Sequence, residues 1–65
     1  MRYKIGELVL GYRDGLGYII AYDEQSDEPY IVEYVTGTIE SHFEENVKTL
    51  KEQLEVQIKH LNELG

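Results

Sequence analysis

Turn-forming residues recur at short intervals along the first two-thirds of the sequence, at Asp14-Gly15, in the acidic stretch 23–29 and at Thr36-Gly37. Glycine takes a positive φ at no steric cost, which suits hairpin turns, and proline cannot donate to a β-ladder. The segments between these turns are rich in alternating apolar residues or in β-branched and aromatic residues, as strands are. The sequence therefore predicts a mostly β domain of short antiparallel strands.

Four strands are predicted, together with a short closing strand at Val47-Lys48. In the first strand, Leu8, Leu10 and Tyr12 alternate onto one face. In the second, Gly17 and Ala21 are expected on one side, where the strand bends or another backbone approaches closely. The four predicted strands cover about residues 7–13, 16–23, 30–35 and 38–40.

Two Ser/Thr-x-x-Glu patterns predict helix starts, because the hydroxyl and the glutamate can satisfy free amides of the first turn. Ser41 with Glu44 predicts a single turn over 42–46, and Thr49 with Glu52 opens a long helix over about 50–64. One face of this helix carries an apolar stripe. The stripe consists of Leu50, Leu54, Ile58, Leu61 and Leu64.

The apolar stripe has two interpretations. We expect it to dock on the open end of the β domain, within the same chain. Alternatively, it forms a short heptad seam for a homo-oligomer through the C-terminal helix, a seam that Gln57 would interrupt. That seam would consist of Val47, Leu50, Leu54, Leu61 and Leu64.

Length and composition limit what can hold the fold together. A 65-residue chain without cysteine has neither disulfides nor thiolate metal sites, so apolar packing or a partner subunit must supply the core. Residues 1–7 contain no apolar signal region, and the longest uncharged stretch, 15–22, is far shorter than the ~20 residues of a membrane span. We therefore expect a cytoplasmic protein without membrane association.

Thirteen acidic against six basic residues give a formal net charge of −7. The bases are scattered among the acids, so nucleic acid is disfavoured as a partner and a protein partner is favoured. The charge also has a simpler interpretation, which is that it keeps a small protein in solution.

Four segments carry a resemblance to a known superfold. Ile5-Gly6-Glu7-Leu8-Val9 is similar to the start of small β-barrels, and Gly15-Leu16-Gly17-Tyr18-Ile19-Ile20 to their glycine-rich second strand. Tyr30 to Tyr34 with Gly37 looks like the third strand and its turn, and the segment 41–50 like a helical turn and closing strand. Together they resemble the SH3-like small-barrel superfold, which includes Tudor and KOW-type domains and several phage and bacterial accessory domains.

The resemblance implies an antiparallel SH3-like barrel of four to five strands over residues 1–49, followed by the C-terminal amphipathic helix at 50–65, as a single domain. The helix is not part of the minimal superfold. The compactness and acidity are similar to those of small phage-encoded proteins that act on host machinery.

Catalytic and metal sites are not predicted. The candidate nucleophiles Ser26 and Ser41 and the candidate bases His42 and His60 lack a convincing pairing, since Ser41 is better explained as a helix cap. The acids of the 23–28 loop lack the alternating spacing, central glycine and distal glutamate of an EF-hand. We therefore expect a non-enzymatic protein without metal or other cofactor.

The acids can be interpreted as a surface that imitates DNA for a nucleic-acid-binding protein, with Glu52 and Glu55 among its contacts. The leading functional hypothesis is a protein-interaction or inhibitor module that occupies a surface on a larger protein through the acidic loop 23–28 and the 40–45 turn. The expected contacts are Asp23, Glu24, Asp27, Glu28, Glu40, Glu44 and Glu45.

The alternative follows from the Tudor resemblance, which implies a cage of aromatic rings that holds a cationic peptide, or recognition of nucleic acid through surface tyrosines. Tyr12, Tyr18 and Tyr34 would form that cage. Tyrosine is also a common strand residue that packs its ring and leaves its hydroxyl in water.

Overall fold

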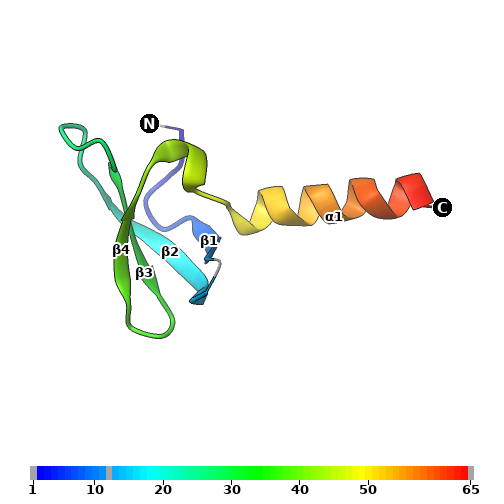
Figure 1. Ribbon diagram of the computed structural model, residues 1–65, viewed down its shortest axis with the longest axis horizontal. Coiled ribbons are helices and arrows are strands. Elements are labelled where there is room, and N and C mark those ends of the chain that lie inside the picture. The colour runs from blue at the N-terminus through cyan, green and yellow to red at the C-terminus, as the bar shows by residue number, and fades with distance from the viewer. Residues whose placement is uncertain (1, 12, 65) are drawn as a thin grey trace.

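The structure is a computed structural model that describes residues 2–11 and 13–64 (Figure 1). Four strands form one antiparallel sheet in the order β1-β2-β3-β4. A short 3₁₀-helix, η1, and one long α-helix, α1, follow the sheet. The bounds are β1 Leu8–Gly11, β2 Gly15–Tyr22, β3 Tyr30–Tyr34, β4 Ile39–His42, η1 Glu44–Asn46 and α1 Leu50–Leu64. The predicted β-rich class with a C-terminal helix is therefore confirmed.

The sheet is open, with β1 and β4 at its two edges. The predicted closing strand at Val47-Lys48 is reduced to an isolated bridge between Val9 and Thr49 and one hydrogen bond, which Leu10 N–H donates to the carbonyl of Lys48 over 2.8 Å. The chain follows β1 only over this short distance before α1 begins at residue 50. A closed barrel is accordingly absent from the described residues.

The first strand faces the opposite way from the predicted alternation. Val9 is the buried residue of β1, whereas Leu8 is 45% exposed and shares the outer face with Leu10. Val9 pairs with Gly17 and bridges to Thr49, so pairing on both sides of β1 decides its orientation. Tyr12, the third member of the predicted row, lies outside the described residues.

The register between β2 and β3 shifts by one residue within β2. Ile19 pairs with Val32 but Ala21 pairs with Ile31, which leaves Ile20 as the extra residue of a bulge. A one-residue shift exchanges the two faces of a strand. Gly17 and Ala21 therefore lie on opposite faces, contrary to the prediction.

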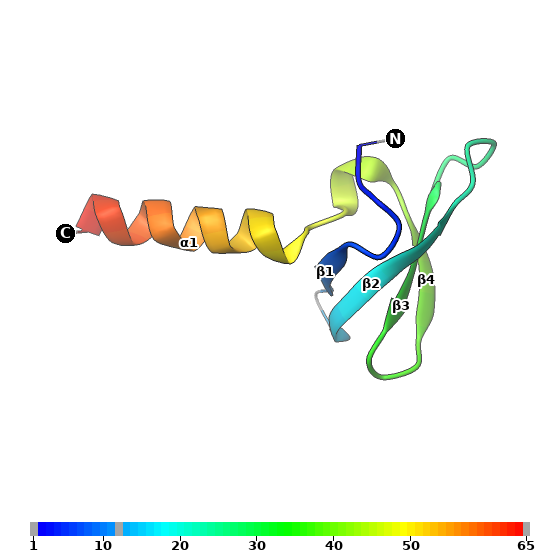
Figure 2. The same ribbon diagram turned by 180° about the vertical axis from the view of Figure 1, so that it is seen from behind.

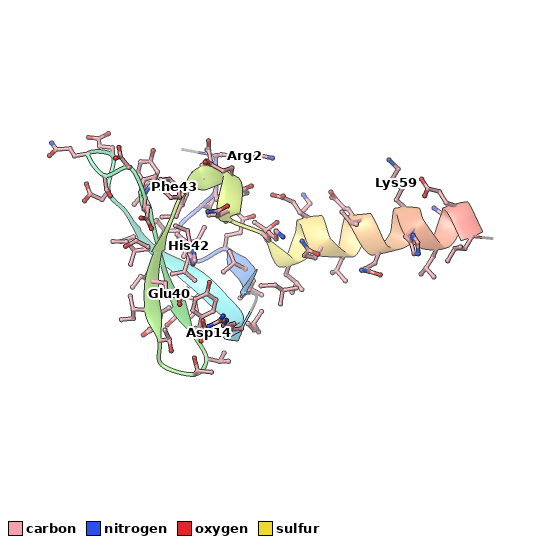
Figure 3. All side chains as sticks on the ribbon, in the orientation of Figure 1. Arg2, Asp14, Glu40, His42, Phe43 and Lys59 are labelled. Atoms are coloured by element: carbon pink, nitrogen blue, oxygen red, sulfur yellow. The ribbon has the colours of Figure 1, made fainter. Side chains whose placement is uncertain are left out.

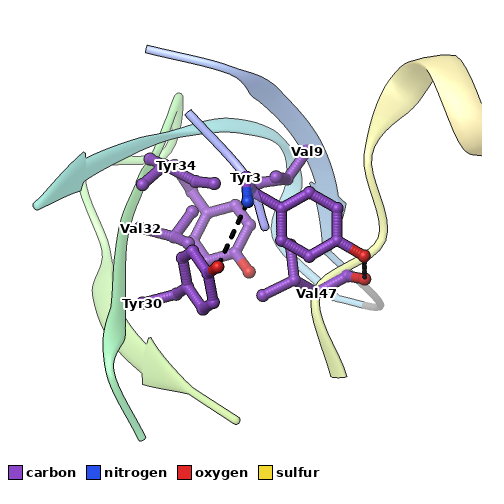
Figure 4. Packing of buried hydrophobic residues seen from close by; sticks show 7 residues of the cluster. Tyr3, Val9, Tyr30, Val32, Tyr34 and Val47 are labelled. Atoms are coloured by element: carbon purple, nitrogen blue, oxygen red, sulfur yellow. Dashed lines mark hydrogen bonds between the residues drawn. The ribbon is translucent and has the colours of Figure 1, made fainter. Parts of the chain in front are cut away.

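The core lies on the inner face of the curled sheet, where Tyr3 and Val47 cover it (Figure 4). The ring of Tyr30 is fully buried and meets the ring of Tyr3 edge to face, with centroids 5.4 Å apart. The Tyr30 hydroxyl accepts hydrogen bonds from the backbone N–H groups of Arg2 over 2.9 Å and of Tyr3 over 3.2 Å. The N-terminal segment is thereby tied to the start of β3.

Only the second predicted capping box forms a cap. Ser41 belongs to β4, and η1 begins after Phe43 without any side-chain cap, so the first box is wrong because pairing with β3 extends the strand through His42. The hydroxyl of Thr49 accepts the N–H of Glu52 over 3.1 Å, as predicted. The long helix has the predicted bounds.

The expected docking of α1 on the β domain is wrong. The helix projects away from the sheet along the longest dimension of the molecule, 44 Å against 25 and 17 Å in the other two (Figures 1 and 2). None of its residues is buried, and only its start contacts β1. The bridge at Thr49 follows the β1 edge and directs the helix outward instead of over the sheet. Within the described residues, no helix is long and apolar enough to cross a membrane.

Candidate binding surfaces

A cleft of about 590 Å³ opens on the inner side of the sheet, between the β1–β2 turn, β4 and the segment after η1. Three of its lining residues, Asp14, Glu40 and His42, are labelled in Figure 3. This volume is in the range of small-ligand sites, about 300–1,000 Å³. Apolar residues such as Val9 and Val32 line its base, and charged residues of both signs line its rim. The charged and polar lining residues include Arg13, Asp14, Glu40, His42 and Lys48.

Tyr34 forms one wall of the cleft and is held there by two glycines. A Cβ on Gly11 would lie 2.5 Å from Cε1 of Tyr34, and a Cβ on Gly17 would lie 2.6 Å from its Cδ1. Real Cβ atoms do not approach other atoms so closely, so any larger residue at either position would displace the ring. The two glycines therefore fix the tyrosine ring against the sheet.

The Tyr34 hydroxyl lies 2.9 Å from Nε2 of His42, and a carboxylate oxygen of Glu40 lies 3.4 Å from the same nitrogen. Burial, followed by the negative charges of Glu40 and Asp14, raises the pKa of Tyr34. A tyrosine hydroxyl is protonated at neutral pH even without this shift. It can donate to a neutral imidazole, and the carboxylate can pair with a protonated one. The side chains of Tyr34, His42 and Glu40 are therefore suited to binding a polar partner.

The candidate nucleophiles do not meet a base. Ser41 precedes His42 in β4, so their side chains point to opposite faces of the sheet. Ser26 accepts the N–H of Glu28 within the β2–β3 loop. His60 lies on α1, which projects away from the sheet (Figure 1). Nowhere in the described chain do three His, Asp or Glu side chains gather as a metal site would require.

The predicted acidic contacts divide into two groups. The β2–β3 loop, with its four acids, and η1, with two more, lie at the same end of the sheet in both views (Figures 1 and 2). Their acids are exposed, and we call this surface the acidic end. Glu40 lies apart from it, in the cleft with His42. The acidic end consists of Asp23, Glu24, Asp27, Glu28, Glu44 and Glu45.

The carboxylates of the acidic end form no ion pair with a described base. The one ion pair found among residues 2–11 and 13–64 joins His42 to Glu40 in the cleft, so no described base pairs with an acid of this end. Glu44 has one polar side-chain contact, a long 3.5 Å hydrogen bond from the hydroxyl of Tyr30.

The tyrosines predicted as an aromatic cage do not come together. Tyr18 lies on the outer face of the sheet and donates a hydrogen bond to Glu33 over 2.9 Å, while Tyr34 is buried on the inner face. Gly17, not Tyr18, pairs with Tyr34, so the two tyrosines project to opposite sides. Tyr12 lies outside the described residues. A cage that needs both Tyr18 and Tyr34 is excluded by this arrangement.

Sequence reasoning missed most of the cleft. The strand period does place Glu40 and His42 on one face of β4, a signal that could have paired them. The approach of Arg13, Asp14 and Lys48 to that face depends on how the sheet curls, which has no local signal.

No protein-family model, curated protein or solved structure matches the chain.

Proposed function

We propose that the chain is a non-enzymatic protein-interaction module that binds a larger, nucleic-acid-binding protein through the acidic end. The observation that carries the proposal is the meeting of two acidic segments, the β2–β3 loop and η1, at one end of the sheet, with none of their carboxylates in an ion pair with a described base. A basic surface evolved for phosphates attracts such an array of carboxylates. Occupying that surface would exclude nucleic acid, so the expected effect on the partner is inhibition.

Charge distribution supports this mode of binding. Ten of the thirteen acids and four of the six bases lie in residues 1–49, so the sheet and its loops carry most of the negative charge. Exposed charges act over a Debye length of about 8 Å at physiological ionic strength. Association with a basic partner should therefore be fast at low salt and weaken steeply as salt rises.

The proposed fold family is the SH3-like small barrel. Its support is the meander of β1 to β4, the 3₁₀ turn after β4 and the Val9–Thr49 bridge, which returns the chain to β1. In this proposal the open sheet is an incompletely closed member of the superfold.

The test uses immobilised protein and the heparin-binding fraction of a bacterial lysate, with duplex DNA as competitor. We expect retention of a nucleic-acid-binding protein that DNA displaces and that raised salt releases. Glu24→Lys combined with Glu45→Lys should lower the affinity for that protein at least tenfold.

Glu55→Lys combined with Glu63→Lys is the matched control, because it makes the same change in net charge on α1 instead of the acidic end. This control should change the affinity less than twofold. Equal losses in the two double variants would mean that net charge alone matters and would contradict the proposal.

A second candidate function rests on the cleft. The fixed ring of Tyr34, the carboxylate of Glu40 and the cleft volume suit a cationic side chain of a peptide. Titration with a lysine-rich peptide, followed by NMR, would then shift the signals of His42. Glu40→Gln should abolish that shift and leave retention by the acidic end intact.

A further inference from the structure

The helix α1 carries an apolar stripe that nothing in the described chain covers. We call Leu50, Leu54, Ile58, Leu61 and Leu64 the α1 stripe. Its last four members are 55–73% exposed, although α1 is a regular helix of 15 residues. Isolated helices of about 12–15 residues are marginal in water, so a helix of this length needs packing on its apolar face. We propose that the α1 stripe packs antiparallel against the α1 stripe of a second copy of this chain.

The spacing of the stripe favours a helix as the occupant. Leu50, Leu54, Leu61 and Leu64 fall on the alternating three- and four-residue steps of a heptad seam, with Gln57 at the central position. A seam of this kind meets a second helix with the same spacing. An identical copy supplies that spacing, and a two-fold axis requires a patch that fits itself.

The charge distribution allows close contact between two copies of the chain only at α1. The sheet and loops of residues 1–49 carry ten acids against four bases, so two such bodies repel one another. The helix carries three glutamates and two lysines and is nearly neutral. A second acidic copy therefore meets the least repulsion where the apolar stripe lies.

The same charges determine the orientation. Parallel pairing would place two acidic bodies side by side at the same end of the helix pair. Antiparallel pairing places them at opposite ends, separated by a helix about 22 Å long. That separation exceeds two Debye lengths at physiological ionic strength, so the repulsion is largely screened.

A groove at the start of α1 can accommodate the C-terminal end of α1 from the second copy. Leu8 on β1 and Leu50, Leu54 and Ile58 on α1 line an open, mainly apolar cavity of about 450 Å³. In an antiparallel pair, the C-terminal leucines of the second copy lie beside this groove. The stripe thus continues onto the outer face of the sheet at Leu8.

The area fits a small interface. Half-exposed leucines and isoleucines each offer on the order of 100 Å² of apolar surface, so the stripe and Leu8 offer about 500 Å² per copy. A standard interface covers about 800 Å² per partner, of which a polar rim provides part. The flanking glutamines Gln53 and Gln57 are suited to that rim. The dimer is therefore expected to dissociate on dilution.

The first experiment is analytical ultracentrifugation of the full chain over a wide concentration range. We expect a concentration-dependent shift from the 7.6 kDa monomer to twice that mass, with no weakening at raised salt. Leu54→Glu combined with Leu61→Glu should abolish the dimer and lower helicity, while the chemical shifts of the buried residues Ile19 and Val32 stay unchanged.

Val56→Glu is the matched control, because Val56 is 58% exposed on the same helix but lies on the opposite side from the stripe. It should leave the dimer intact. A monomer at every concentration, a dimer that survives the double variant, or equal loss with Val56→Glu would each overturn the proposal.

Orientation is tested with introduced thiols, since the chain has no cysteine. Gln53 and His60 lie on the same edge of the stripe. In an antiparallel helix pair the like edges face each other, whereas in a parallel pair each edge faces the partner's other edge. On oxidation of a mixture of Gln53→Cys and His60→Cys chains, antiparallel pairing gives the mixed disulfide. In a parallel dimer the two thiols lie on opposite sides of the helix pair, so a dimer that forms no mixed disulfide would overturn the orientation. These outcomes are independent of the acidic end, whose variants leave the stripe unchanged.

Discussion

The sheet and α1 obtain their stability in different ways. The sheet buries Ile19, Tyr30 and Val32 almost completely, because side chains from different strands pack against one another. The helix has a cap and an apolar stripe, yet buries no residue within the chain. Regular secondary structure is therefore no measure of how much a segment contributes to the core. The difference also locates the two functions that we propose, recognition at the sheet end and self-association at the helix.

The largest expected effect comes from a matched pair of isoleucines. Ile19→Ala removes a fully buried side chain and should lower the free energy of unfolding by about 2–5 kcal/mol. A domain of this size has only about 3–10 kcal/mol in total, so the substitution should remove a large fraction of its stability. Ile58→Ala, at 59% exposure, should cost less than about 0.5 kcal/mol in dilute protein. Urea denaturation measures both, and similar losses would break the comparison.

A pair of tyrosines compares the inner and outer faces of the sheet. Tyr30→Phe removes the hydroxyl that accepts two backbone N–H groups of the N-terminal segment and should cost about 1–3 kcal/mol. Tyr18→Phe removes only an exposed contact with Glu33 and should cost less than about 0.5 kcal/mol. Hydrogen exchange should show faster exchange of the Tyr3 amide in the first variant alone. An unchanged exchange rate at Tyr3 would contradict the assigned role of the Tyr30 hydroxyl.

The two predicted capping boxes provide a test at the junction between sheet and helix. Thr49→Ala removes the cap of α1 and should cost about 1 kcal/mol, with a loss of helical circular dichroism. Ser41→Ala should be close to neutral, because Ser41 lies exposed in β4 and caps nothing. Thr49→Ser keeps the hydroxyl and should retain most of the helicity. A larger effect at Ser41 than at Thr49 would reverse the assignment of the caps.

The smallest expected effect is a loss of stability at alkaline pH. It should come from the sheet and the N-terminal segment and not from α1. Burial raises the pKa of Tyr34 and of Tyr3 above the ordinary value of about 10, while α1 contains no tyrosine. Between pH 10 and the folded pKa, the unfolded chain binds fewer protons than the folded chain, so stability falls as pH rises. Below about pH 9 these groups contribute no pH dependence. Urea denaturation at pH 8 to 11 should show the decline, and Tyr34→Phe should reduce its slope; an equal slope would contradict this account.

Sequence patterns predicted those elements that depend on local signals. The bounds of α1 follow from the Thr49 cap and the stripe, and the turns at Gly15 and Gly37 follow from the positive φ that both glycines adopt. The misses depend on pairing. The bulge at Ile20 has no marker because all of 16–22 is apolar or glycine, and Val9 became the inward residue through contacts with Gly17 and Thr49. The cleft was missed for the same reason, since its two sides meet only after the sheet curls.

The two glycines behind Tyr34 have a consequence for divergence among related chains. Positions 11 and 17 carry no side chain, yet a methyl group at either would collide with the ring. The acids of the β2–β3 loop, by contrast, are solvent-exposed and can exchange or move by a residue without disturbing the core. The spacing of Gly11, Gly17 and Tyr34 should therefore persist in distant homologues after the charged surface has drifted beyond detection. A search profile weighted on that spacing would trace the ancestry of the scaffold better than one weighted on its acidity.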